Sequence, residues 1–133
     1  PVEWNGQKYL DGGLADNIPL GKCLELGCDK VIIVLTRPFG YVRKENLTAI
    51  TRLCYPRYKN LHRTVQNRNE NYNNRIKQIE ELEREGKMFV LRPSEEMFIS
   101  RLEKDPVRLE QVYALGLKDA AAQWQALEEY LAK

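Results

Sequence analysis

The sequence predicts an α/β fold with one long helix and a helical C-terminal region. Its first strong signal is the uninterrupted apolar run at residues 31–35 (VIIVL), which is rich in β-branched residues and typical of a buried strand. Residues 57–85 follow with an amphipathic pattern of helical period, and a second apolar segment lies near 88–92. Because a long helix separates the two strands, we expect them to pair in parallel.

The first elements of the chain are a short strand and a glycine turn. "QKYL" predicts the strand, which leads directly into Asp11, Gly12 and Gly13. Asp-Gly between apolar runs is typical of a two-residue hairpin turn, in which both central residues take positive φ. The turn therefore has a purely structural interpretation beside any chemical role of Asp11.

A short helix follows the turn and precedes the apolar strand. "NIPLGKCLELG" predicts this helix, with Asp16 or Asn17 as its N-cap, Pro19 near its first turn and Gly27 at its end. The strand at 31–35 carries no polar interruption, so we expect it to be covered on both faces.

The long helix is the main element of the middle of the chain. Residues 38–56 predict a loop with one short helix over 45–54, after which the long helix begins and continues to Gly86. Its opposite face is rich in asparagine, so packing rather than intrinsic propensity must stabilise it. The apolar stripe consists of Leu61, Val65, Tyr72, Ile76, Ile79 and Leu82.

The last part of the chain is predicted to be helical almost to its end. Asp105 precedes Pro106, which occupies the first helical position, where a missing N–H is harmless. A glycine inside this segment, Gly116, predicts a division into two helices.

The sequence lacks the motifs of several common catalytic and binding sites. The two serines, Ser94 and Ser100, lie outside any Gly-x-Ser-x-Gly sequence, and we find no phosphate-binding or dinucleotide-binding glycine loop. His62 is the single histidine, so we expect neither a metal nor a cofactor. Three cysteines without redox or zinc spacing predict buried free thiols. With no run of about 18 apolar residues and no signal-peptide pattern, we expect a cytoplasmic protein.

Basic residues are concentrated in the middle of the chain. Nine Lys and Arg lie between Arg37 and Arg75, against two acidic residues, Glu45 and Glu70. Such a block can form a solvated face or touch an anionic membrane surface, which leaves peripheral membrane contact open. No nucleic-acid reader motif accompanies it, so we expect no nucleic-acid partner.

Asp11 is the one residue here whose setting suits catalysis. A carboxylate at the end of a strand, on a glycine turn, is exposed and well fixed, and it could accept a proton from a serine hydroxyl supplied elsewhere. Gly12 and Gly13 would let a substrate or a partner backbone approach. Because ionised Asp is a weak base, oxyanion stabilisation would have to assist the proton transfer.

The segment "GQKYLDGGLADNIPLGKCLELGCDKVIIVLTRP" resembles the region around the catalytic aspartate of patatin-like phospholipases. The matching residues are Asp11, Gly12, Gly13, Asn17 and Pro19, followed by the apolar strand. The later "NLHRTVQNRNENYNNRIKQIEELEREGKMFVLRPS" and "SRLEKDPVRLEQVYALG" are similar to the C-terminal region of a bacterial subgroup of that family.

This resemblance implies a serine acyl hydrolase with a Ser-Asp dyad, in which Asp11 is the base and the substrate is a lipid or acyl ester. It implies that residues 1–40 end the catalytic α/β/α domain and that residues 41–133 form a mostly helical region with one further strand near 88–92. The oxyanion loop and serine would come from an upstream half, so we expect this piece to be inactive alone. We also expect it to self-associate through an unprotected strand edge. The alternative is a non-catalytic regulatory or anionic-membrane-binding helical module.

Overall fold

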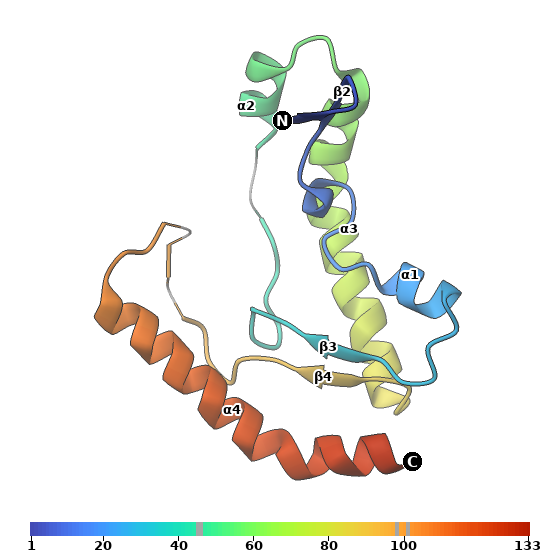
Figure 1. Ribbon diagram of the computed structural model, residues 1–133, viewed down its shortest axis with the longest axis vertical. Helices are drawn as coiled ribbons and strands as arrows, with labels where there is room; N and C mark the ends of the chain where they lie inside the picture. Colours follow the sequence, from blue (N-terminus) through green and yellow to red (C-terminus); the bar gives the residue numbers. More distant parts are fainter. Residues whose placement is uncertain (45–46, 98, 101) are drawn as a thin grey trace. The chain divides into compact units, whose positions relative to one another are not determined.

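The chain combines short strands with two long helices and so is of mixed α/β character (Figure 1). The structure is a computed structural model that describes residues 1–44, 47–97, 99–100 and 102–133. It consists of two compact units, the first formed by 1–28 and 42–81, the second by 29–41 and 82–133. The elements in chain order are β1 (Val2–Trp4), β2 (Gln7–Tyr9), η1 (Gly12–Leu14), α1 (Leu20–Glu25), β3 (Ile32–Val34), α2 (Thr48–Cys54), α3 (Lys59–Arg84), β4 (Phe89–Leu91) and α4 (Pro106–Ala132).

The first unit begins with an antiparallel hairpin made by β1 and β2. Val2 pairs with Tyr9, and the turn between the strands is formed by Asn5 and Gly6, with φ of 50° and 70°. Two successive positive φ values are what a tight turn with the right-handed twist of the strands requires, and Asn-Gly is its preferred sequence. The expected strand "QKYL" is therefore β2, paired with a strand that our sequence reasoning did not predict.

The Asp-Gly hairpin expected at Asp11 is wrong. Asp11 has φ −53° and ψ 127°, and the next residues form the single 3-10 turn η1. Neither Gly12 nor Gly13 has a positive φ. The Asp11 side chain satisfies a backbone N–H by capping this turn, which removes the need for a hairpin.

Helix α1 begins at Leu20, two residues later than a cap by Asn17 would place it and three later than a cap by Asp16 would. Pro19 is its N-cap residue and makes no side-chain cap hydrogen bond, so the predicted cap by Asp16 or Asn17 is wrong. Asp16 Oδ1 instead accepts the Ile18 N–H at 3.3 Å. Leu20 is 2% exposed and anchors α1 in the first unit. As predicted, Gly27 lies just beyond the helix end, with φ 67°.

Helix α2 covers part of the expected 45–54 helix, whose first two residues lie outside the described residues. Helix α3 confirms the long amphipathic helix, with Val65 and Ile79 buried on its apolar stripe. On its polar face, the Asn73 amide accepts the Arg43 N–H at 2.9 Å and donates to the Arg43 carbonyl at 3.2 Å. This double contact ties an irregular segment to α3, as a strand partner would.

In the second unit, β3 and β4 lie side by side as a parallel pair (Figure 1), with Ile33 opposite Val90. Both of these residues are buried. On the other face, however, Ile32 is 42% and Val34 70% exposed. The parallel pairing is confirmed, whereas the expectation that the strand is covered on both faces is not met by the described part of the chain.

Helix α4 packs on β4 and runs unbroken through Gly116, so the predicted division into two helices is wrong. A single glycine lowers helix stability by only about 1 kcal/mol, which the packing of Leu115, 8% exposed, can offset. At the other end of the helix, the rings of Tyr130 and Phe89 lie 5.8 Å apart.

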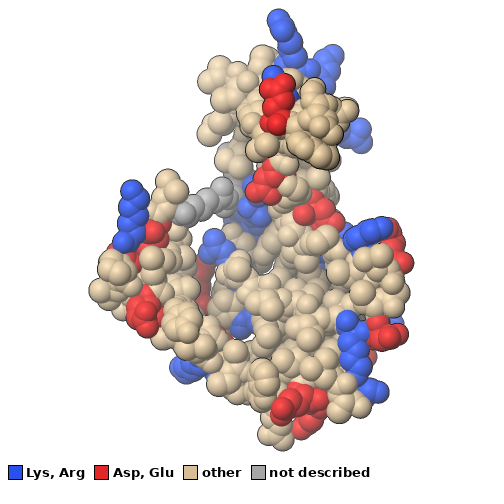
Figure 2. All heavy atoms as spheres, in the orientation of Figure 1, with Lys and Arg blue, Asp and Glu red and all other residues tan. Residues whose placement is uncertain are grey.

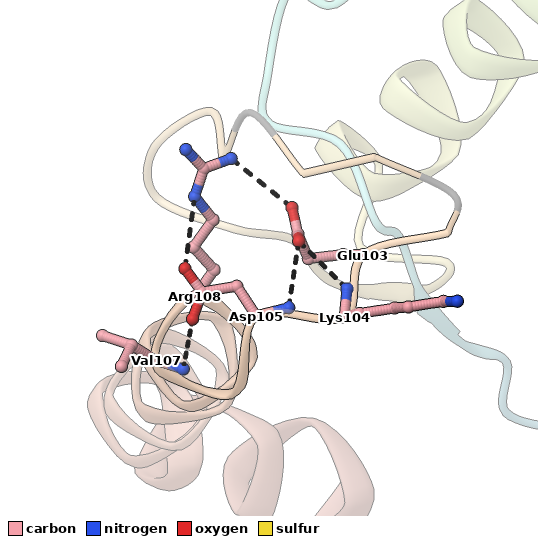
Figure 3. Close-up of polar contacts among 5 residues, drawn as sticks. All are labelled: Glu103, Lys104, Asp105, Val107 and Arg108. Carbon is pink, nitrogen blue, oxygen red and sulfur yellow. Dashed lines mark hydrogen bonds and ion pairs between the residues drawn. The ribbon is translucent and has the colours of Figure 1, made fainter.

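Both ends of α4 have specific partners. At the N-terminus the Asp105 carboxylate accepts the Val107 N–H at 3.0 Å, while Glu103 accepts the backbone N–H groups of Lys104 and Asp105 (Figure 3). At the C-terminus the Lys30 ammonium donates to the carbonyls of Tyr130 and Leu131 at 2.7 and 2.8 Å. These contacts satisfy groups that a helix end leaves unpaired.

The three cysteines are free thiols, but Cys28 and Cys54 are exposed and Cys23 is half-buried, so the expected burial is wrong. Cys54 is the last residue of α2 and Cys28 lies beyond the end of α1, where the local apolar pattern does not determine burial. Among the helices that the structure describes, none has the length and apolar character needed to cross a membrane.

Candidate functional site

Asp11 lies immediately after β2 and Leu10, at the start of the 3-10 turn. Its Oδ1 accepts the Gly13 N–H at 2.8 Å, and its backbone carbonyl accepts the Leu14 N–H at 3.0 Å. Within the described part of the chain, the contact with Gly13 is the one hydrogen bond of this carboxylate. One oxygen is therefore fixed by the turn, on a residue that is exposed as a whole.

The two glycines after Asp11 differ in how much space surrounds them. A Cβ on Gly13 would lie 3.2 Å from Asp11 Oδ1, closer than most side-chain contacts, and at an ordinary contact distance of 3.7 Å from Asn17 Oδ1. A Cβ on Gly12 would meet nothing within 4 Å. Gly13 therefore shapes the motif by keeping the Asp11 carboxylate in place, and Asn17 lies beside it, whereas Gly12 has no such packing requirement.

A polar pocket of about 380 Å³ lies between the segment that follows Asp11 and helix α3, entirely within the first unit. Residues 14–18 form one wall. The other wall is the asparagine-rich face of α3, with Arg68, Asn71, Tyr72, Asn74, Arg75 and Gln78. Two asparagines of this helix, Asn71 and Asn74, thus line the pocket.

Charges of both signs meet in this pocket. The Arg75 guanidinium lies 4.0 Å from Asp16 Oδ2 and donates to Gln78 Oε1 at 2.8 Å. Arg68 adds a second cation to the lining. With two arginines and one carboxylate, the pocket carries a positive balance and several amide groups that can bind oxygen atoms of a ligand.

Other residues considered from the sequence do not complete a catalytic set. In the first unit, Asp11 has no hydrogen bond to a serine, cysteine or histidine side chain among the described residues. Ser94 and Ser100 belong to the second unit. His62 Nε2 lies 2.7 Å from the Tyr55 carbonyl, a backbone contact that joins the end of α2 to α3. The described residues contain no cluster of three or more metal-ligating side chains.

Residues 58–132 match the family model of DUF6363, a domain of unknown function. The chain belongs to the DUF6363 family. Comparison with curated proteins and with solved structures gave no match. The DUF6363 match covers α3, β4 and α4, and it therefore includes the α3 wall of the pocket but excludes Asp11 and residues 14–18. The pocket lies between the DUF6363 part of the chain and residues 14–18, which follow the Asp-Gly-Gly motif.

Sequence reasoning identified Asp11 but missed the pocket beside it. Asn71, Asn74 and Gln78 recur on one face of a long helix, and this polar recurrence was the available signal. What could not be predicted was which loop lies against that face, since the contact joins segments some fifty residues apart and leaves no local pattern.

Proposed function

We propose that Asp11 is the general base of a patatin-like serine acyl hydrolase, of which this chain supplies the C-terminal portion. The observation that carries the proposal is the Asp11 carboxylate itself, an exposed residue whose Oδ1 is held by the Gly13 N–H at 2.8 Å. A base needs one such oriented oxygen within reach of the proton that it removes. The resemblance of the Asp-Gly-Gly segment to patatin-like phospholipases supports the same role.

The reaction would proceed in two steps. In the first, a serine hydroxyl outside these 133 residues transfers its proton to Asp11 Oδ2 as its oxygen attacks the ester carbonyl. The carbon–oxygen bond to the alcohol then breaks, and the alcohol leaves with the proton from Asp11. In the second, Asp11 takes a proton from water, the hydroxide attacks the acyl-serine, and the proton returns to the serine as the fatty acid departs. Backbone N–H donors stabilise the oxyanion in both steps.

The test is ester hydrolysis by a protein that joins this chain to an upstream Gly-x-Ser-x-Gly segment, measured with p-nitrophenyl butyrate. Asp11→Asn should lower kcat by about 10²- to 10⁴-fold, the usual contribution of a general base. Asp29→Asn changes another exposed carboxylate and should leave the rate unchanged. Retention of full activity by Asp11→Asn would exclude the proposed role.

The 133-residue chain measured alone separates the role of Asp11 from the origin of the serine. We expect no hydrolysis above the background rate. If the chain alone hydrolysed the ester and Asp11→Ala abolished this activity, the proposed upstream serine would be wrong, although Asp11 would still be the base.

A second candidate function is docking on an anionic membrane, which the surface around α2 and the start of α3 favours. Residues 47–69 contain no Asp or Glu but include the exposed cations Arg52, Arg57, Lys59 and Arg63. Figure 2 shows Lys and Arg side chains extending from this end of the first unit. Apolar side chains stand among them, with Ile50 62%, Leu53 83% and Tyr58 53% exposed. Cations beside exposed apolar residues suit an anionic lipid surface.

Sedimentation with vesicles tests this second function. Binding to phosphatidylglycerol vesicles should exceed binding to phosphatidylcholine vesicles and should weaken with added salt. Loss of one cation, as in Arg57→Gln, should weaken binding about fivefold, because each cation near such a surface contributes about 1 kcal/mol. Leu53→Ser should also weaken binding, while Leu102→Ser, at an 84% exposed leucine of the second unit, should not. Equal binding to both vesicle types would exclude an electrostatic membrane site.

A further inference from the structure

The second unit contains an apolar groove of about 500 Å³ that neither the Asp11 turn nor the membrane surface involves. Its floor is the carboxyl end of the parallel pair, and one wall is the middle of α4. Ligands of α/β proteins commonly bind at the carboxyl ends of parallel strands, and volumes of this size are typical of small-molecule sites. The large aliphatic side chains of the lining are Val34, Leu35, Leu91, Met97, Ile99, Val112 and Leu115.

The shape of the groove depends on small residues of α4. Gly116 and Ala120 lie one turn apart on the helix face that lines it, and a Cβ on Gly116 would meet nothing within 4 Å. Val34 on the floor is 70% exposed, so the groove presents uncovered aliphatic surface. No described residue lining the groove is aromatic. This lining suits a flexible aliphatic chain better than a flat ring.

The polar groups at the rim differ in how strongly they are held. The Asp119 carboxylate accepts the Ser94 N–H at 2.9 Å, and Arg92 forms an ion pair with Glu83. Arg37 has two weaker partners: its guanidinium lies 3.8 Å from Glu96, with the two side chains 37% and 41% exposed, and 4.8 Å from the centre of the Tyr41 ring. Such an exposed pair contributes little, so Arg37 can turn toward an anionic group at the end of the strand.

We propose that this groove binds a single saturated acyl chain, with its carboxylate at Arg37. The aliphatic lining would cover the chain, and the arginine would supply a charge-assisted hydrogen bond to the head group. The proposal is independent of the proposed hydrolase, because it requires binding alone and uses no residue of the Asp11 turn.

The test is calorimetric titration of the 133-residue chain with sodium decanoate and sodium dodecanoate, both below micelle formation. Each buried methylene tightens binding about fourfold, so dodecanoate should bind about fifteenfold more tightly than decanoate. Equal dissociation constants for the two acids, or no saturable heat with either, would overturn the proposal.

Two substitutions in α4 test whether the groove is the binding site. Gly116→Leu places a side chain over the groove and should weaken dodecanoate binding by at least about tenfold. Leucine is a better helix former than glycine, and retained helicity by circular dichroism will confirm the fold. Ala121→Leu is the control, because residue 121 lies about 140° around α4 from residue 116. Equal weakening by both substitutions, or by neither, would contradict the groove as the site.

Two further measurements do not depend on the folding of Gly116→Leu. Arg37→Gln should weaken decanoate about tenfold while leaving 1-decanol unchanged, since only the acid has a charge for Arg37 to bind. Nuclear Overhauser contacts should connect the methylene protons of dodecanoate to the methyl groups of Val34. A bound chain without contacts to Val34 would overturn the assignment of the groove floor. An unchanged affinity of Arg37→Gln for decanoate would overturn the assignment of Arg37 to the carboxylate.

Discussion

The Lys30 ammonium lies 2.7 Å from the backbone oxygen of Tyr130, across a hundred residues of sequence. It also donates to the Leu131 carbonyl, and the Tyr130 hydroxyl in turn accepts the Val31 N–H at 3.1 Å. A cation at a helix C-terminus satisfies unpaired carbonyls and interacts favourably with the helix dipole. This contact fixes the end of α4 to the start of β3.

Replacing Lys30 should therefore destabilise the second unit. We expect Lys30→Met to lower the free energy of unfolding by about 1 kcal/mol, measured by urea denaturation. Lys118→Met, in the middle of α4, is the matched control and should change stability much less. A Lys30→Met protein as stable as the original would show that the helix end needs no cation.

The two glycines of the Asp-Gly-Gly motif should respond differently to alanine. In Gly13→Ala, the new methyl group would displace the Asp11 carboxylate and weaken its cap, with a loss of about 1 kcal/mol. Gly12→Ala meets open space at negative φ and should be neutral or stabilising by about 0.5 kcal/mol. Urea denaturation of both variants tests this, and the order of their stabilities is the decisive result.

The hydrogen bonds that hold the N-terminus of α4 should become less stable at low pH. The backbone N–H of Asp105 and then that of Lys104 hold the pKa of Glu103 below its ordinary value of 4.5 (Figure 3). A carboxyl group whose pKa falls on folding stabilises the fold above its unfolded pKa, and this contribution is lost as the pH falls through the folded pKa. Hydrogen-exchange protection at Asp105 should therefore decrease below pH 4.5.

Substitution at Glu103 isolates that contribution. In Glu103→Gln the protection of the Asp105 amide should be lower at neutral pH and should vary less with acid. Glu110→Gln, at an exposed position within α4, should preserve the original pH dependence. If the Glu103→Gln protein also kept the original pH dependence of protection at Asp105, a group other than Glu103 would be responsible for it.

The exposed edge and face of β3 should make the chain self-associate. Among the described residues β3 pairs with β4 alone, and Val34 is 70% exposed. An open strand edge with apolar side chains is a site for pairing with a second copy. Sedimentation equilibrium with a reductant present, because Cys28 and Cys54 are exposed, should show dimers that Val34→Lys removes. A monomer at high concentration would contradict this expectation.

The sequence boundaries of DUF6363 and those of the folded units differ. A chain of residues 58–132 would lack β3, the partner of β4, together with Lys30. We expect it to unfold with a broad, weakly cooperative transition in urea. A chain of residues 29–133 keeps the whole second unit and should unfold cooperatively. Equal cooperativity of the two chains would show that β3 is dispensable.

Elements governed by local chemistry could be predicted from the sequence. The apolar run before Pro38 predicted β3, and the Asp105-Pro106 pair predicted the start of α4. Gly86, with φ 70°, marked the end of α3. In each case the deciding interaction lies within a few residues along the chain. The parallel pairing of β3 with β4 was also predictable, because a long intervening helix excludes a tight hairpin.

The errors arose where a local signal competed with another interaction. Asp-Gly at residue 11 suggested a hairpin, but the Asp11 side chain capped a 3-10 turn instead, and Asn5-Gly6 formed the hairpin. Gly116 did not break α4 because tertiary packing outweighs one weak helix former. Both ligand-sized pockets escaped prediction, since their walls come from segments distant in sequence.

The discontinuity of the second unit has a consequence for synthesis on the ribosome. Residues 29–41 leave the ribosome long before residues 82–133, which supply β4 and α4. At about 5–20 residues per second, the hundred residues between Lys30 and Tyr130 take about 5–20 s to translate. During that time β3 lacks its partner strand β4 and the helix α4 that packs on β4. A nascent chain stalled within α4 should therefore be a preferred client for chaperones that recognise exposed apolar strands.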